Sequence, residues 1–281
     1  MKTTRQQSAI LLAVFGASNL MGQKALKDFE EQVRLHFADM PVRWAFTSAM
    51  LRRRLAADGT KSDSVEKALS RMGFEKFTRV AVQPLHLIHG LEFESVLEEC
   101  RRAAHGAGPG RVRVGHPLLR SDNDALRAAD ALFTHLPPDR HPEDAVLYVG
   151  HGSRHAARSG YAALAEKLRL RDPRIFIDTL ADDPASSVAQ VKDSGASRVW
   201  LLPLLALIGK HAQTDIAGDG PESRRSLLEA AGLTCLPVLR GTLEYKGFAD
   251  LWLERLEAAV AGLINEQATP SEEYVACDSA E

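Results

Sequence analysis

The stretch Val146-Leu-Tyr-Val-Gly-His-Gly-Ser-Arg-His155 joins a strand signal to a glycine turn that carries a histidine. Residues 145–149 form a short apolar run, typical of a buried strand, and Gly150-His151-Gly152-Ser153 follows at once. Glycine allows a sharp turn and lets a ligand approach the main chain. Because open α/β sheets bind ligands at the carboxyl ends of their strands, His151 stands where a ligand is expected. Its imidazole can bind a metal or take a proton near neutral pH, or it can simply cap the following helix.

Length and composition indicate a globular enzyme of one large or two medium domains. The chain has 281 residues, of which 45% are hydrophobic and 26% are charged. The formal net charge of −2 argues against a nucleic-acid partner, because a surface that binds nucleic acid needs a cationic excess to neutralise phosphates.

Neither the cysteines nor the N-terminal residues indicate an exported or membrane-bound protein. Cys100, Cys235 and Cys277 are odd in number and widely spaced, so they predict no disulfide framework and no metal knuckle. The apolar run at residues 10–15 stops at Gly16, far short of the about 20 residues that a membrane span needs. It fits a first strand better than a signal peptide. We therefore expect a cytoplasmic protein without a membrane partner.

Short apolar strands alternate with amphipathic helices along the chain. Strands are expected at residues 10–15, 42–46, 79–84, 111–115, 145–149, 175–178, 198–203 and 233–237. Such alternation predicts parallel sheets covered by helices on both faces. The expected fold class is α/β, with two similar Rossmann-like domains, each a parallel sheet flanked by helices, and an active-site cleft between them.

The most turn-rich stretch, Pro137-Pro-Asp-Arg-His-Pro142, marks the expected domain boundary. It gives an N-terminal α/β domain over residues 1–139 and a C-terminal α/β domain over residues 140–265. The last helix, at residues 245–264, can pack back on the N-terminal domain. Residues 266–281 are polar and acidic, so we expect a frayed tail there.

The two halves carry an internal sequence repeat. Arg79-Val-Ala-Val-Gln-Pro-Leu-His-Leu-Ile-His-Gly-Leu-Glu92 can be placed over Arg198-Val-Trp-Leu-Leu-Pro-Leu-Leu-Ala-Leu-Ile-Gly-Lys-His211 with one residue of slip. Each half then has a metal-competent side chain two residues after a glycine. Val14-Phe-Gly16 likewise matches Val149-Gly-His151, so that glycine in one half corresponds to histidine in the other.

Equivalent loops at the carboxyl ends of equivalent strands thus carry Glu92, His151 and His211. If the halves face each other across a cleft, these three side chains can converge. Two histidines and a carboxylate form an open divalent-metal site, and imidazole suits late first-row metals. A single loop histidine is usually a surface residue, so it is the coincidence of three such positions that favours a metal-binding and catalytic site.

Other motifs carry less chemistry. Gly-His-Gly-Ser153 lacks the G-x-S-x-G order of a serine-hydrolase elbow, and no phosphate-binding glycine motif occurs. His86 either lines the cleft or packs beside it, and His89 is either an extra ligand or a solvated side chain. The arginines at residues 52–54 form a solvated helix face, or one of them reaches an anionic ligand.

Five stretches occur in the order and spacing of one enzyme family. They are Phe15-Gly-Ala-Ser18, Ala45-Phe-Thr-Ser48, Val82-Gln-Pro-Leu-His-Leu-Ile-His-Gly-Leu-Glu-Phe-Glu94, Gly150-His-Gly-Ser153 and Pro203-Leu-Leu-Ala-Leu-Ile-Gly-Lys-His-Ala-Gln-Thr-Asp215, which Ala217-Gly-Asp219 continues. Through them the chain resembles the anaerobic-type sirohydrochlorin cobalt chelatases, which belong to the class II tetrapyrrole chelatases. The resemblance covers about residues 8 to 265.

This resemblance implies a chelatase-like fold and a lyase that inserts Co²⁺ into sirohydrochlorin during anaerobic cobalamin synthesis. It places the metal on His151 and His211, with a glutamate that helps. The family's usual position for that glutamate falls at Ala181, so that Asp182 or Glu92 can stand in, or the third ligand can be absent. No permanently bound cofactor is implied, because Co²⁺ (or Fe²⁺) is a substrate.

Two alternative functions stay open, and the resemblance also implies which partners the protein has. One alternative is an iron chelatase that makes sirohaem, and the other is a metal or tetrapyrrole carrier without turnover. The expected partners are sirohydrochlorin and a divalent metal ion, and a homo-oligomer is common in the family. His89 could hold an extra metal or haem. The substrate carboxylates could be held by Lys210, Arg154 or the arginines at residues 52–54.

Metal insertion requires the macrocycle to lose two pyrrole N–H protons. A neutral His151 can accept one of them, while His211 and a carboxylate strip water from the ion and present it. An open site suits this task, since the metal must be released. Gly16, which matches His151 in the repeat, would leave room for the flat macrocycle.

Overall fold

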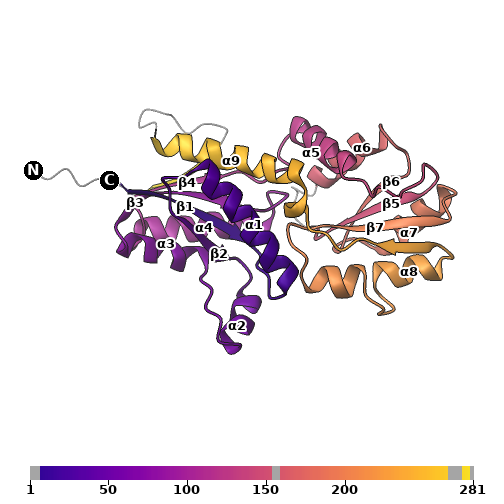
Figure 1. Ribbon diagram of the computed structural model, residues 1–281, viewed down its shortest axis with the longest axis horizontal. Helices are drawn as coiled ribbons and strands as arrows, with labels where there is room; N and C mark the ends of the chain where they lie inside the picture. Colours follow the sequence, from indigo (N-terminus) through magenta and orange to yellow (C-terminus); the bar gives the residue numbers. More distant parts are fainter. Residues whose placement is uncertain (1–6, 154–158, 265–273, 279–281) are drawn as a thin grey trace, which may run out of the picture. The chain divides into compact units, whose positions relative to one another are not determined.

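The computed structural model describes residues 7–153, 159–264 and 274–278, and these residues form two separate sheets (Figure 1). The chain divides into two compact units. Unit 1 comprises Met1–Ser18, Leu26–Leu118 and Asp250–Glu281, and unit 2 comprises Asn19–Ala25 and Leu119–Ala249. Each unit is built around one of the sheets.

The sheet of unit 1 has five strands in the order β2-β1-β3-β4-β9. They are β1 (Gln7–Val14), β2 (Val42–Phe46), β3 (Phe77–Pro84), β4 (Arg111–Gly115) and β9 (Tyr274–Asp278). The first four run parallel to one another, and β9 runs antiparallel to β4 at the edge. The interior strand β1 is apolar and fully buried over residues 9–13, as expected for a sheet with both faces covered.

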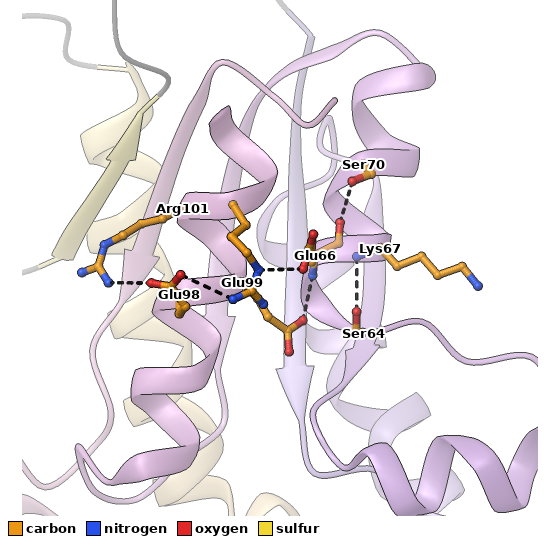
Figure 2. A network of polar contacts seen from close by, with 8 residues as sticks. Ser64, Glu66, Lys67, Ser70, Glu98, Glu99 and Arg101 are labelled. Atoms are coloured by element: carbon orange, nitrogen blue, oxygen red, sulfur yellow. Dashed lines mark hydrogen bonds and ion pairs between the residues drawn. The ribbon is translucent and has the colours of Figure 1, made fainter. Parts of the chain in front are cut away.

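Among the described residues, three α-helices lie wholly in unit 1 and two more lie partly in it. These helices are α1 (Leu20–His36), α2 (Ala49–Ala57), α3 (Val65–Phe74), α4 (Leu91–His105) and α9 (Lys246–Ile264). Helices α3 and α4 pack beside each other and contribute Leu69 and Phe93 to the main core of the unit. Polar contacts join the two helices at the surface (Figure 2): Arg102 Nε donates to Glu66 Oε2 at 2.9 Å, and the Glu66 amide donates to Glu99 Oε2 at 2.9 Å.

The sheet of unit 2 has four parallel strands in the order β6-β5-β7-β8. They are β5 (Ala145–Gly150), β6 (Ile175–Thr179), β7 (Arg198–Leu204) and β8 (Thr234–Pro237). The α-helices of this unit are α5 (Asp122–Thr134), α6 (Ser159–Arg169), α7 (Pro184–Asp193) and α8 (Arg224–Ala230). A π-helical turn, η2 (Ala212–Ile216), follows β7, and a short 3-10 turn, η3 (Thr242–Glu244), precedes α9.

The Asp144 carboxylate joins the amino ends of β5 and β7. It accepts hydrogen bonds from Arg198 at 2.9 Å and 2.6 Å, from Trp200 Nε1 at 3.0 Å and from the His141 amide at 3.1 Å. The contact with Arg198 is the largest cause that lowers the pKa of Asp144 below its usual value, and the other two donors add to it against the opposing effect of burial. A charged Asp144 thus ties together the starts of the two strands.

The two sheets share one strand order, since β2-β1-β3-β4 in unit 1 corresponds to β6-β5-β7-β8 in unit 2. The internal repeat and the α/β class expected from the sequence are therefore confirmed. All eight predicted strands are present, with ends that differ by at most three residues from those expected.

The boundaries of the units differ from the expected ones. The division passes between Leu118 and Leu119 instead of residues 139 and 140, because α5 packs on α6, where Lys167 Nζ lies 2.8 Å from Asp122 Oδ2. The proline-rich turn at residues 137–142 therefore only connects α5 to β5 within unit 2. The last helix contributes to unit 1 from Asp250 onward.

The expectation of a frayed tail over residues 266–281 is wrong for Tyr274–Asp278, which form β9. This strand pairs with all of β4, from Arg111 opposite Asp278 to Gly115 opposite Tyr274. The Tyr274 ring lies against Gly262 of α9, where a Cβ atom would come within 2.5 Å of it. Among the helices that the structure describes, none is both long and apolar enough to cross a bilayer.

Candidate metal centre

The connections of unit 2 place two loops side by side at the carboxyl edge of its sheet. The chain leaves β5 toward β6 on one side and leaves β7 toward β8 on the other, so the direction of winding changes between β5 and β7. Ligands of open α/β sheets bind at such a switch point, beyond the carboxyl ends of the strands. Gly150 pairs with Leu204 at this edge, and the loops that follow carry His151 and His211.

The local geometry of the first loop depends on its two glycines. A Cβ atom at Gly150 would lie 2.6 Å from the ring of Tyr161, and one at Gly152 would lie 2.3 Å from Thr179 Oγ1. Gly152 also has a φ of 78°, a left-handed conformation that favours glycine. The main chain can therefore pass close to β6, and this path leaves the side chain of His151 exposed.

The second loop is anchored before it reaches His211. Asn19 Nδ2 donates to the Ile208 carbonyl at 2.7 Å, and Asn19 Oδ1 accepts from the Gly22 amide at 2.7 Å. Ile208 itself is buried, so its side chain and its carbonyl are both held. His211 stands three residues further on, at the start of the π-helical turn η2.

The rings of His151 and His211 lie together, with centroids 5.2 Å apart and planes at 74°. With metal–nitrogen bonds of about 2.1 Å and a tetrahedral angle of about 109°, two imidazole ligands of one ion have ring centres roughly 5 Å apart. The observed separation therefore allows both side chains to bind the same ion. Both rings are accessible from solvent, since His151 is exposed and His211 is 42% exposed.

A carboxylate supports His211 from within the same turn. His211 Nδ1 lies 2.5 Å from Asp215 Oδ2, and the Thr214 hydroxyl donates to Asp215 Oδ1 at 2.7 Å. Desolvation acts to raise the pKa of Asp215, but the hydrogen bonds from Thr214 and His211 outweigh it and hold that pKa below its usual value. The carboxylate is therefore charged at neutral pH. The sequence motifs assign no role to Asp215, although its spacing of four residues from His211 places both on one side of a helical turn.

The predicted carboxylate ligand Glu92 lies in unit 1, in the first turn of α4. Its Oε2 atom is 3.7 Å from His86 Nε2, and its side chain is 44% exposed. The convergence of Glu92 with the two histidines of unit 2 stays a prediction. Asp182 lies in unit 2, where its Oδ2 accepts from Thr179 Oγ1 at 2.7 Å.

The turn that holds Asp182 contacts the loop of His151. A Cβ atom at Gly152 would lie 2.8 Å from Ala181 Cβ, so Asp182 is one residue from this contact. Among the described residues, no three His, Cys, Asp or Glu side chains are gathered closely enough to hold a metal ion. Within unit 2, the site is therefore a histidine pair.

A buried ion pair fixes the same turn from its other side. Arg224 of α8 contacts the Asp178 carboxylate at 2.5 Å and donates to the Thr179 carbonyl at 2.9 Å. Burial is the largest effect on Asp178 and raises its pKa, although Arg224 acts against it. Through this pair, α8 holds the end of β6 against which the loop of Gly152 packs.

Of the other predicted residues, His89 and Arg52 have partners within unit 1, and Lys210 is exposed. His89 Nε2 lies 2.5 Å from Glu94 Oε1 in unit 1. Arg52 donates to the Thr47 carbonyl at 2.9 Å, so it holds the end of β2. Lys210 is exposed beside His211 and suits an anionic group. Arg154 lies outside the described residues.

Gly16 is required by the packing of unit 1 itself. Its φ is 109°, and a Cβ atom there would lie 2.7 Å from Leu51 Cδ2 and 2.8 Å from Phe46 Cδ2. The absence of a side chain at this position thus has a local cause. The glycine at position 16 can therefore be explained without the expected role of leaving room for a macrocycle.

Solved structures of chelatases share this fold. SirB from Bacillus subtilis with Fe³⁺ has a TM-score of 0.63 at 18% identity, over 91% of this chain and 96% of that chain. The sirohydrochlorin chelatase SirB of Bacillus subtilis subspecies spizizenii, in complex with cobalt, also has a TM-score of 0.63, at 15% identity over 92% of this chain and 98% of that chain. At these identities the likeness shows that the chain shares the fold of the class of metal chelatases.

Sequence comparison assigns the family within that class. The family model described as cobalt chelatase (CbiK) matches residues 8–261. The chain therefore belongs to this family. The sirohydrochlorin cobaltochelatase CbiKC of Nitratidesulfovibrio vulgaris is 48% identical over 259 residues, which is 92% of each chain. The sirohydrochlorin cobaltochelatase of Salmonella typhimurium is 29% identical over 266 residues, 93% of this chain and 100% of the relative.

Proposed function

We propose that this chain inserts Co²⁺ into sirohydrochlorin, with His151 and His211 as the residues that bind the metal. The observation that carries the assignment of these residues is the ring separation of 5.2 Å at the switch point of the unit 2 sheet. The substrate is inferred from the relative that is 48% identical over 92% of the chain and is named for this reaction.

The histidine pair suits a metal that is transferred. Two neutral imidazoles bind a divalent late first-row ion, and they leave its other positions open to water and to the incoming macrocycle nitrogens. As the metal enters the ring, two pyrrole protons must leave. Once His151 has released the ion to the macrocycle, its freed nitrogen can accept one of these protons, and the other passes to solvent, which His151 faces because it is exposed.

The test is a spectrophotometric assay of Co²⁺ insertion with His151→Ala and His211→Ala. We expect each variant to fold and to insert Co²⁺ at least about 100-fold more slowly, because each substitution removes a ligand. His151→Ala also removes a proton acceptor. His105→Ala, which changes an exposed histidine at the end of α4, is the control and should insert metal at the wild-type rate. Wild-type rates in both site variants would contradict the assignment.

Two further arms of this assay separate the alternatives. Glu92→Gln should slow insertion while Asp182→Asn does not, and the reverse result would assign the helping carboxylate to Asp182. Initial rates with Co²⁺ and Fe²⁺ in parallel distinguish a cobalt enzyme from an iron enzyme. Several turnovers per chain exclude a stoichiometric carrier.

The proposed function also implies a metal partner, a cellular location and an oligomeric state. We expect the metal to be its only inorganic partner, as a substrate, and expect no permanently bound cofactor. Action in the cytoplasm and assembly into a homo-oligomer are further expectations, and sedimentation of the purified protein tests the second.

A further inference from the structure

We infer that Asp215 is a positioning residue, which fixes the proton of His211 on Nδ1 and orients the ring so that Nε2 is its metal-binding atom. The inference rests on the proposed function, because it assigns a role to a residue that acts through a proposed ligand. It concerns the short turn that begins at His211 and continues through η2.

The contact between the two side chains is built into the turn. His211 Nδ1 lies 2.5 Å from Asp215 Oδ2, four residues further along. The Ala217 amide bonds to the Ala212 carbonyl at 3.0 Å, a π-helical closure that encloses this segment. Single π-helical turns are uncommon and occur often at functional sites. The pair is therefore formed by the backbone geometry of the turn and does not depend on a distant element.

The carboxylate is itself oriented. Thr214 Oγ1 lies 2.7 Å from Asp215 Oδ1, so the two oxygens of the carboxylate have different partners. Rotation of the carboxylate would break both contacts at once. Such a doubly held acceptor restricts the His211 ring, although the side chains of His211 and Asp215 remain 42% and 46% exposed.

The charge of Asp215 determines which nitrogen of His211 can bind a metal. An ionised carboxylate only accepts hydrogen bonds, so the imidazole nitrogen that faces it must carry a hydrogen. In the neutral ring the lone pair then lies on Nε2. Carboxylates that accept from the second nitrogen of a ligating histidine fix its tautomer and raise its basicity, and their loss costs about 10- to 100-fold in metal affinity.

The test measures Co²⁺ binding to the purified chain without sirohydrochlorin, by calorimetry, for Asp215→Ala, Asp215→Asn and Asp215→Glu. We expect the alanine variant to bind Co²⁺ about 10- to 100-fold more weakly, the asparagine variant to be similarly impaired, and the glutamate variant to recover part of the loss. Asp219→Asn is the matched control, because Asp219 is also in this loop, is 91% exposed and pairs with Arg225.

A second readout follows the ring directly. Nitrogen-15 NMR of the metal-free protein should show the His211 proton on Nδ1 in the wild type and a mixture of tautomers in Asp215→Ala. A purely structural role of Asp215 would lower the melting temperature without this change. If the alanine variant does not fold, Thr214→Val tests the same support, with a smaller loss of affinity expected.

The outcomes separate this inference from the proposed function. If His211→Ala abolishes insertion while Asp215→Ala binds Co²⁺ within about twofold of the wild type and keeps the Nδ1 proton, the positioning role is overturned and the function stands. If His211→Ala inserts metal at the wild-type rate, the proposed ligand set itself fails.

Discussion

At the scale of residues, the centre consists of two imidazoles brought together by loops of one sheet. A closed site of four ligands would hold a metal as structure, whereas two neutral ligands leave positions at which the ion can be exchanged. The rings of His151 and His211 are accessible and 5.2 Å apart, a geometry that suits the proposed capture of an ion and its release.

Gly152 provides the sharpest stability prediction at this scale. Gly152→Ala should destabilise the fold by about 3 kcal/mol for two reasons. Alanine is strained in the left-handed conformation of this residue, and its Cβ atom would clash with Thr179. It should also slow insertion roughly 10- to 100-fold, since the clash displaces His151. Urea unfolding and the insertion assay measure the two effects.

Gly195→Ala is the matched control for that variant. Gly195 has a φ of 76°, close to that of Gly152, but nothing lies within 4 Å of its Cβ position. Only the strain of about 1 kcal/mol should remain, with activity unchanged. Equal losses of stability in the two alanine variants would show that the contact with Thr179 does not matter.

The sequence predicted the two histidines through their loops but not the details of the site. His151 and His211 stood out because glycine turns follow apolar strands in both halves. The distance between the rings depends on the pairing of β5 with β7, which no local pattern encodes. Asp215 has no distinctive sequence signal, because an aspartate four residues after a histidine is common on any helical surface.

At the scale of elements, the Asp144 contacts predict how the stability of unit 2 depends on pH. The folded protein holds the pKa of this carboxyl below its usual 3.8, so the charged form stabilises the fold above that pH. The contribution is complete at neutral pH and is lost as the pH falls below about 3.8 toward the folded value.

Asp144→Asn tests this dependence. At pH 7 it should lower the free energy of unfolding by about 2 kcal/mol, a modest value because Arg198 is partly exposed. The difference from the wild type should shrink between pH 4 and pH 2, as the wild-type carboxyl takes up its proton. Urea unfolding at several pH values measures it, and a difference that is the same at pH 7 and pH 2 would refute the prediction.

The two elements that the sequence failed to predict, β9 and the π-helical turn η2, do not coincide with a local apolar run. Apolar runs indicated the eight parallel strands, most of which are largely buried. Tyr274–Asp278 is only partly buried and shows no regular alternation, and its order comes from β4, which lies far away in the sequence. The π-helical turn after β7 likewise has no sequence signal of its own and was expected to be a loop.

At the scale of the whole molecule, β9 covers the edge of β4 in unit 1. An uncovered edge strand is a template for pairing with other chains. Cys277→Asp places a carboxylate at a position that is 3% exposed in the core, so we expect a loss of about 3 kcal/mol, release of β9 and aggregation. Melting temperature and light scattering measure these effects.

Ala276→Asp is the control for the release of β9. Ala276 lies on the same strand, opposite Arg113, and is only partly buried. The new carboxylate can remain in water there, so little change is expected. If both variants melt and aggregate alike, the covering of the edge by β9 is not the cause.

The discontinuity of unit 1 affects the order in which the two units can fold during synthesis. Its sheet and helices include residues 250–264 of α9 and Tyr274–Asp278 of β9, which are synthesised after Ala249, whereas every residue of unit 2 has been made by Ala249. Domains fold as units once their sequence is available. The half of the chain that carries both histidines can therefore complete its sheet while the earlier half still awaits α9 and β9.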